Sequence, residues 1–393
     1  MSSRVAWAVA LAVALAIGGA AVLFAVGRSD PAPSRPPVQP SRPPAQPTTT
    51  AVPARTCSGP QPPRTPAGER AGFTEGASIG GREGAALEAE LAGIAATGAR
   101  YLRIDVDWSA IEQVRGTQDW SVVDRIVDGA RLCGLDVIGL IAYTPQWARP
   151  PGTSEHSPPT DPSTFATFAR AAVERYALRG IKTWQVWNEP NLTFFWEPAP
   201  DPARYAALLG PTYDAIKAAD PSSTVIMGGL APAEQQPRQE AMQPLPFLEG
   251  VYAAGGGGKF DALGYHPYTY PALPQEDTGG ASDAPFVQVT PKLHDVMAAH
   301  GDRRKQIWGT EMGAPTVTGT SPEFLAAYIT QAYQGWNQWS FTGPLIWYSY
   351  VDAGTNPTDP EDNFGIVRAD FIPKEPAFAA FEKAMRRPPP RSR

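Results

Sequence analysis

From about residue 72 onward, eight short runs rich in β-branched and aromatic residues alternate with longer amphipathic stretches. Strands that alternate regularly with helices build parallel sheets, because each helix carries the chain back to the start of the next strand. Eight such units predict an α/β fold, a closed (β/α)8 TIM barrel, over residues 72–387. The predicted strands lie near residues 77–80, 100–106, 136–142, 182–188, 224–229, 262–266, 306–310 and 344–349.

An open doubly wound sheet is the alternative arrangement for the same alternation. It would need a glycine-rich phosphate-binding turn after its first strand, and the sequence after Ser78-Ile79-Gly80-Gly81 has no such dinucleotide pattern. The glycine run at residues 255–258 precedes a predicted strand, whereas a phosphate-binding turn follows a strand. We therefore favour the barrel and expect no cofactor.

The first 66 residues differ in composition from the rest of the chain. Val5 to Val26 are apolar or small throughout, and a run of about 20 such residues can span a bilayer. We predict a signal peptide or a signal anchor over residues 1–28. Residues 31–66 contain 13 of the 44 prolines and no acidic side chain, which predicts a disordered linker over residues 29–71. A linker of this kind favours a retained anchor, and cleavage is the alternative.

These segments predict an exported protein that is extracellular or tethered to the outer face of the cytoplasmic membrane by its amino-terminal helix. The first 66 residues carry a charge of about plus five and the remainder about minus eleven, which argues against nucleic-acid binding. We expect a monomer that contacts the membrane only through that helix, with a disordered basic tail at residues 388–393. Cys57 and Cys133 can form one bridge in an oxidising compartment, and two unpaired thiols are the alternative.

Two glutamates lie where strand-like runs end. Glu189 follows the run 184–188, and Glu311 follows the run 306–310. Parallel barrels gather their chemistry at the C-terminal ends of strands, where side chains reach a shared cavity. We therefore interpret Glu189 and Glu311 as catalytic, with solvated loop acids or helix caps as the alternative. Two carboxylates at two strand ends predict glycoside hydrolysis.

Other polar side chains near the predicted strand ends would fit around a sugar. Arg103 lies inside a strand and needs an acidic partner, so a buried salt bridge to Asp105 or Asp136 is the alternative explanation. His266 and Tyr268 share one strand face, because side chains alternate along a strand.

Aromatic residues concentrate just after the predicted strands, where ring faces can stack on sugars. We assign Trp147, Trp196 and Trp347 to the sugar site and Trp187 to the core, with ordinary packing as the alternative for each. No metal is expected, because the four histidines have no metal-ligand spacing and both cysteines are remote from them.

The segments Trp187-Asn188-Glu189-Pro190-Asn191 and Thr310-Glu311-Met312-Gly313 resemble two motifs of the retaining β-glycosidases of clan A. The first is similar to the acid/base motif on the fourth strand, and the second to the nucleophile on the seventh. Glycoside hydrolase family 39 is the most similar family, with the family 5 cellulase-like enzymes as a neighbour. The segment 142–147 lacks the histidine that many family 5 enzymes use to bind sugar, which favours family 39.

The resemblance implies roles for further residues. Arg103 would support the nucleophile, Asn188 would hold the sugar 2-hydroxyl, and His266 with Tyr268 would line the site. Trp347 would form the floor of the subsite beside the cleaved bond.

The same resemblance implies double displacement on an oligo- or polysaccharide. Glu311 attacks the anomeric carbon while Glu189, which should have a raised pKa, protonates the leaving oxygen and then activates water. This requires carboxyl groups about 5–5.5 Å apart, whereas an inverting pair lies about 6.5–9.5 Å apart. A non-catalytic carbohydrate-binding barrel at the cell envelope is the alternative, and a structural envelope protein ranks third. The sugar, the linkage and the exo or endo mode remain open.

Overall fold

The computed structural model describes residues 57, 64–233, 241–277, 284–318 and 320–386. These residues belong to one compact unit of the chain, residues 53–393. The predicted amino-terminal helix, most of the predicted linker and the predicted tail at 388–393 lie outside the described residues. Within the described ranges, no helix combines the length and the apolar character that a membrane span requires.

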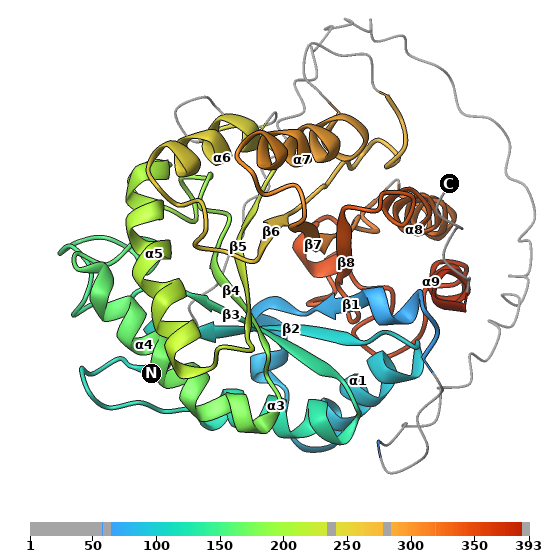
Figure 1. The fold of residues 1–393 in the computed structure, drawn as a ribbon. Coiled ribbons are helices and arrows are strands. Elements are labelled where there is room, and N and C mark those ends of the chain that lie inside the picture. Colours follow the sequence, from blue (N-terminus) through green and yellow to red (C-terminus); the bar gives the residue numbers. More distant parts are fainter. Residues whose placement is uncertain (1–56, 58–63, 234–240, 278–283, 319, 387–393) are drawn as a thin grey trace, which may run out of the picture. The chain divides into compact units, whose positions relative to one another are not determined.

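Eight parallel strands form a closed barrel in sequence order, with β8 paired to β1 (Figure 1). The predicted TIM barrel is therefore confirmed. The strands are β1 (Ala71–Thr74), β2 (Tyr101–Asp107), β3 (Asp136–Ala142), β4 (Thr183–Asn188), β5 (Thr224–Leu230), β6 (Ala262–Tyr265), β7 (Gln306–Met312) and β8 (Thr342–Tyr348).

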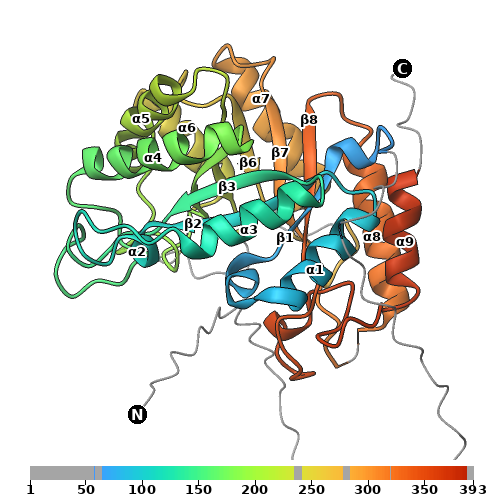
Figure 2. The same ribbon diagram turned by 90° about the horizontal axis from the view of Figure 1, so that it is seen from below.

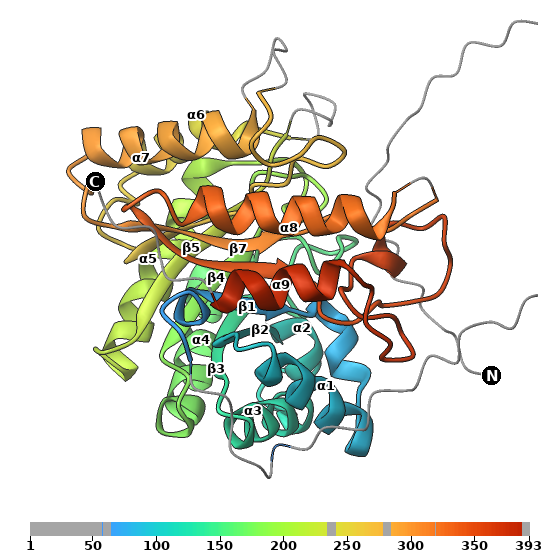
Figure 3. The ribbon, with the colours of Figure 1, turned by 90° about the vertical axis from the view of Figure 1, so that its right-hand side faces the viewer.

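Helices cover the outside of the barrel, and the last two, α8 and α9, lie side by side across β8 (Figure 3). On another side, α1 and α3 lie together beneath β2 and β3 (Figure 2). Asp161, Asp201 and Ser321 each accept hydrogen bonds from backbone N–H groups at a helix start that also carries proline in its first turn. The helices are α1 (Gly84–Ala96), α2 (Trp108–Ile111), α3 (Ser121–Leu132), α4 (Pro162–Tyr176), α5 (Pro202–Ala219), α6 (Pro244–Ala253), α7 (Thr290–Ala299), α8 (Pro322–Trp336) and α9 (Ala377–Arg386).

The first strand is the one that the sequence misplaces. Residues 77–80 belong to a 3-10 helix, η2 (Gly76–Gly81), and β1 lies earlier in the chain. All four residues of β1 are buried between β2 and β8, and a Cβ on Gly72 would come within 2.6 Å of Tyr101. The predicted linker also ends too late, because a 3-10 helix, η1 (Gly68–Arg70), precedes β1. The other seven predicted strands overlap the observed ones.

The core has two parts. A large cluster fills the space between strands and helices, and a smaller one consists of Ile138, Ile226, Ala262, Trp308 and Ile346, from five different strands. Ile138 lies in register with Arg103, so its side chain points into the barrel. This smaller cluster fills the barrel interior below the C-terminal ends of the strands.

A disulfide joins Cys57 to Cys133, which follows α3. The bridged alternative is therefore confirmed, and two unpaired thiols are excluded. The bond closes a sequence separation of 76 residues and fastens the segment before β1 to the outer helical layer.

Two buried carboxyl groups follow β1 in the chain, Glu75 directly after the strand and Glu90 in α1. Glu75 accepts a hydrogen bond from the backbone N–H of Tyr350 at 2.6 Å, so it holds the chain where it leaves β8. Glu90 of α1 is fully buried, and the Arg82 guanidinium lies 3.0 Å away. Burial raises the pKa of Glu75 well above its usual value and that of Glu90 to about 7.

A carboxyl group whose pKa is higher in the folded than in the unfolded protein binds its proton more tightly in the native state. The stability from this pair is present below about pH 4.5 and declines as the pH rises toward 7. The melting temperature of the wild type should therefore fall between pH 5 and pH 8. Replacing Glu90 with Gln is expected to reduce that fall by a few degrees, because glutamine does not titrate. Thermal unfolding at both pH values measures this, and Glu88→Gln, on the exposed face of α1, is the control. Parallel pH profiles for wild type and Glu90→Gln would contradict the assignment.

Candidate active site

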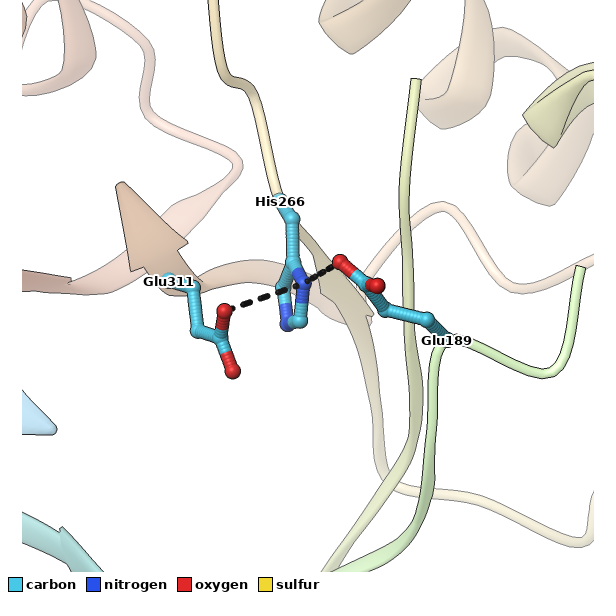
Figure 4. Close-up of side chains that lie close together, drawn as sticks. All are labelled: Glu189, His266 and Glu311. Atoms are coloured by element: carbon cyan, nitrogen blue, oxygen red, sulfur yellow. Dashed lines mark hydrogen bonds and ion pairs between the residues drawn. The ribbon is translucent and has the colours of Figure 1, made fainter. Parts of the chain in front are cut away.

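Glu189 and Glu311 meet at the C-terminal end of the barrel. Glu189 directly follows β4 and is 9% exposed, while Glu311 lies near the end of β7. Their carboxylates flank the His266 imidazole, which follows β6 (Figure 4). An oxygen of Glu189, an oxygen of Glu311 and a nitrogen of His266 all lie within 4.8 Å of one another.

The backbone is strained where the chain leaves β4. Trp187 has a φ of 71° and Glu189 a φ of 42°, a region that costs non-glycine residues about 1–3 kcal/mol each. The surrounding contacts hold this conformation: the Trp187 indole donates to the Phe195 carbonyl at 2.7 Å, and the Glu189 N–H donates to the Gly229 carbonyl at 3.1 Å. Asn191 adds side-chain hydrogen bonds to the backbone of Ala231, so the whole motif is fixed against the end of β5.

His266 is fully buried and contacts both sides of the site. Its Nδ1 lies 2.7 Å from Glu189 Oε1 and 3.6 Å from Glu311 Oε2, and its Nε2 lies 3.1 Å from Thr310 Oγ1. Gly229 makes room for the ring, because a Cβ at that position would lie 2.1 Å from Nε2. The glycine in β5 is thus a requirement of the site.

Arg103 supports Glu311 from inside the barrel. The guanidinium is 1% exposed, and its Nη1 donates to Glu311 Oε1 at 2.7 Å. Its other hydrogen bonds reach Thr74 Oγ1, Gln185 Oε1 and Asn188 Oδ1 at 3.1, 2.8 and 2.8 Å. The buried partner of Arg103 is therefore the predicted nucleophile, while Asp136 pairs with Arg100 instead.

Tyr268 completes the contacts of Glu311, because its hydroxyl donates to Oε2 at 3.1 Å. The sequence thus brings His266 and Tyr268 to the two carboxylates as expected, and Asn188 reaches the same cluster through Arg103. A role in holding substrate remains a prediction for all three.

Trp347 is misassigned by the sequence. It is in register with Phe73, is fully buried and packs on Tyr328 and Tyr333 of α8, on the outside of the barrel. The next residue, Tyr348, is in register with Thr74, points inward and donates to Glu361 at 2.9 Å. Alternation along the strand therefore gives the inward position to Tyr348.

Trp196 also differs from expectation, whereas the assignment of Trp147 to the sugar site stays a prediction. Trp196 is fully buried against Trp187 and Tyr205, which makes it part of the core, as predicted for Trp187. Trp147 is partly exposed, packs edge-on against Trp108 and donates to the backbone of Glu112. Its ring therefore lies near the β2 and β3 loops and remains a candidate for sugar contact.

The pKa values of the two glutamates diverge. Burial raises the pKa of Glu189, and the charge of Glu311 raises it further, against the hydrogen bond from His266. Burial would also raise the pKa of Glu311, but the positive charges of His266 and Arg103 and the hydrogen bonds from Tyr268 and Arg103 hold it below its usual value. One carboxyl group is thus kept as an acid and the other as a carboxylate.

Other chemistries fit the site less well. Glu189, His266 and Glu311 offer donor atoms that could hold a metal ion, but Arg103 already neutralises Glu311 and His266 bonds Glu189 directly. Ser78 lies in a Gly-x-Ser-x-Gly pattern, typical of serine hydrolases, yet its hydroxyl donates to the Glu75 carbonyl within η2 rather than standing on a strand-to-helix elbow.

Sequence reasoning missed several residues of the site. Gln185 had a usable signal, because it is a polar residue inside a fully buried strand. Thr74 was missed because the predicted first strand, at residues 77–80, begins after it. Glu361, in the loop after β8, gave no local signal, since its position depends on Tyr348.

Replacing His266 with Asn is expected to raise the pKa of Glu189, because the change removes a hydrogen bond that favours the carboxylate. Carbon-13 NMR titration of glutamate-labelled protein measures this without reference to turnover. The exposed His300, replaced in the same way, is the control. An unchanged or lower Glu189 pKa in His266→Asn would contradict the assigned contact.

The chain is similar to known proteins in its fold and, over a short stretch, in its sequence. No family model matches the chain. A β-xylosidase from Geobacillus stearothermophilus is 38% identical over 81 residues, which is 19% of this chain and 16% of that protein.

Solved structures match over most of the described chain. A family 39 glycoside hydrolase from Bacteroides cellulosilyticus WH2 has a TM-score of 0.66 and 25% identity, covering 82% of this chain and 65% of its own. A monomeric β-xylosidase from Caulobacter crescentus CB15 has a TM-score of 0.61 at 22% identity, over 80% of this chain and 67% of its own. GH5_18 from Streptomyces cattleya in complex with GlcNAc has a TM-score of 0.62 at 17% identity, over 84% and 82%.

This chain spans about two thirds of the family 39 structure and a small part of the curated β-xylosidase. It shares more of its sequence with the family 39 structure than with GH5_18. The resemblance to the clan A glycosidases of families 39 and 5 is therefore confirmed.

Proposed function

We propose that this protein is a retaining glycoside hydrolase that cleaves β-glycosidic bonds of an oligo- or polysaccharide by double displacement. The observation that carries the proposal is the pair Glu189 and Glu311: one oxygen of each lies within 4.8 Å of the other, and their pKa values are shifted in opposite directions. So close an approach of two oxygens suits carboxyl groups about 5–5.5 Å apart, as in retaining enzymes, better than the about 6.5–9.5 Å that admits a water in inverting ones.

Glu311 is the nucleophile, because its depressed pKa keeps it charged and Arg103 and Tyr268 fix its two oxygens. Glu189 is the acid, since its raised pKa retains a proton for the leaving oxygen. When Glu311 forms the glycosyl bond it loses its charge, which lowers the pKa of Glu189. Glu189 then acts as the base that activates water, and the anomeric configuration is retained.

The remaining residues position these groups. His266 orients Glu189, and Arg103 orients Glu311 and the Asn188 amide oxygen. The Asn188 amide nitrogen is then available for the sugar hydroxyl next to the reacting carbon. Asn188, His266 and Tyr268 are the substrate contacts in this proposal, with Trp147 at the rim. Because several similar proteins are β-xylosidases, xylosides are the first substrates to test.

The alternative, a non-catalytic carbohydrate-binding barrel, is not favoured. Binding alone does not require one protonated and one ionised carboxyl group at this separation. The backbone strain at Trp187 and Glu189 is likewise typical of a functional site.

Incubation with 2-deoxy-2-fluoro β-glycosides, starting with the xyloside, should attach one sugar to the peptide that contains Glu311. The fluorine slows both formation and hydrolysis of the intermediate, while the activated leaving group restores the rate of formation, so the intermediate accumulates. Peptide mass spectrometry locates the label. Glu311→Gln should take up none, while Glu189→Ala should still be labelled by a dinitrophenyl glycoside, whose leaving group needs no acid. Label on any other peptide would contradict the nucleophile assignment.

We propose that the protein is exported and held at the outer face of the cytoplasmic membrane by its amino-terminal segment. The apolar run from Val5 to Val26 and the proline-rich residues that follow support this proposal, as does the Cys57–Cys133 bridge, since disulfides persist in oxidising compartments. We also propose a monomer, because the exposed large apolar side chains of the described residues are few. They are Val114, Val122, Leu132, Leu178 and Phe194.

Protein isolated under alkylating conditions should carry no label on Cys57 or Cys133 until a reductant is added. Reduction should then lower the free energy of unfolding by about 2–5 kcal/mol. Alkylation with mass spectrometry and denaturant titration measure the two effects, and Cys133→Ser, titrated with and without reductant, is the control. Full alkylation before reduction would contradict export.

A further inference from the structure

The charge of Glu311 acts on two carboxyl groups that the proposed mechanism does not use, Asp105 and Glu361. Asp105 is two residues after Arg103 on β2, so it faces the same side of the strand, into the mouth of the barrel. It is partly exposed, and among the described residues its carboxylate has no hydrogen-bond partner. Glu361, in the loop after β8, accepts the hydrogen bond of Tyr348 from the other side.

Strand register places both groups on the nucleophile's side of the site. Asp105 shares a strand face with Arg103, which donates to Glu311. Glu361 accepts from Tyr348, which is in register with Thr74, another partner of Arg103. Burial raises the pKa of Asp105 to about 6, and the charges of Asp107 and Glu311 raise it further against Arg103. Burial likewise raises the pKa of Glu361 to about 7, and the charge of Glu311 contributes more to this than that of Glu189. In the proposed mechanism the nucleophile contacts the anomeric carbon of the sugar that is transferred, which is the glycone, whereas the acid contacts the leaving oxygen. Asp105 and Glu361 therefore flank the glycone.

The positive charge of Arg103 is not available to balance the charges of Asp105 and Glu361. Every nitrogen of Arg103 donates to a protein group, to Gln185, Thr74, Glu311 or Asn188. The main charged side chains that act on Glu361, within the part of the chain that the structure describes, are carboxylates. A negatively charged sugar placed here would meet three carboxyl groups and no unengaged cation.

A structural role does not account for Asp105. Its neighbour on the same face, Asp107, caps α2 by accepting from the N–H groups of Ser109 and Ala110. Asp105 has no comparable bond, although it sits deeper in the mouth. A half-buried carboxylate without a protein donor is only partly solvated, and hydroxyl groups of a ligand would supply the missing hydrogen bonds.

Building on the proposed function, we propose that Asp105 and Glu361 determine the specificity of the glycone subsite, which accepts a neutral sugar and rejects a uronic acid. Above about pH 7 both groups are ionised, and ionised carboxylates accept hydrogen bonds and donate none, so they suit sugar hydroxyls. A uronate would bring a like charge into a partly buried site, which is an effective means of excluding a competing ligand. An amino sugar would be tolerated by the same charges, so the acid group is what the subsite excludes.

The test is made at about pH 8, where both carboxyl groups are ionised. It compares matched pairs of aryl glycosides that differ in one group, the 4-nitrophenyl β-D-glucoside with the glucuronide and the galactoside with the galacturonide. For wild type, kcat/KM for the neutral sugar should exceed that for its acid by about 100-fold or more, a difference expected for uncompensated like charge. Asp105→Asn and Glu361→Gln should each narrow that ratio by about tenfold, through a higher kcat/KM for the acid.

Two further variants separate charge from structure. Tyr348→Phe removes the hydrogen bond to Glu361 but keeps its charge, so the ratio should remain high. Glu88→Gln, which removes one exposed carboxylate from α1, should leave both the ratio and the activity unchanged. Melting temperatures of all variants confirm that they are folded.

A wild-type ratio within threefold of one would overturn the proposal. So would variants that lower both substrates equally, because a merely structural role predicts that result. If no glycoside is hydrolysed and no fluorosugar label is found, the proposed function fails by itself. The charge preference is then read by calorimetry, from the binding of a neutral iminosugar against its uronic acid counterpart in wild type and Glu361→Gln.

Discussion

The buried guanidinium of Arg103 is the interaction on which the site depends. A charge that is almost wholly removed from water must be matched by hydrogen bonds, and here the partners come from β1, β4 and β7. Thr74, Gln185, Asn188 and Glu311 are therefore held together at one point by the requirement to satisfy a single side chain. The rigidity that the proposed retaining mechanism needs follows from this network and from the barrel that carries it.

His266 couples the two glutamates without making them equivalent. It bonds Glu189 directly and acts on Glu311 through its charge, while Arg103 and Tyr268 contact Glu311 alone. Both carboxyl groups are buried, so burial by itself would raise the pKa of each. The unequal distribution of donors is what separates an acid from a carboxylate, and Gly229 makes that distribution possible by leaving space for the imidazole.

Much of this arrangement could be predicted because its signals are local. The strand-end position of Glu189 and Glu311 follows from the alternation of strands and helices, and the shared face of His266 and Tyr268 follows from the period of a strand. The failures have physical causes as well. The first strand has four residues and is recognisable through its neighbours, β2 and β8, rather than through its own pattern. Trp347 and Trp196 looked like sugar-binding residues by type and place, and packing against α8 and Tyr205 put both rings in the core.

By itself the sequence determined the barrel, the two acids and most residues in contact with them, because periodicity and strand ends specify which side chains face the cavity. The tertiary structure decided which of these groups contact one another. It paired Arg103 with Glu311 rather than with Asp136, placed Tyr348 inward in place of Trp347, and brought Asp105 and Glu361 within reach of the charge of Glu311. These outcomes depend on register between strands and on loops that meet across the barrel, which are distances in space that a single chain's local pattern does not contain.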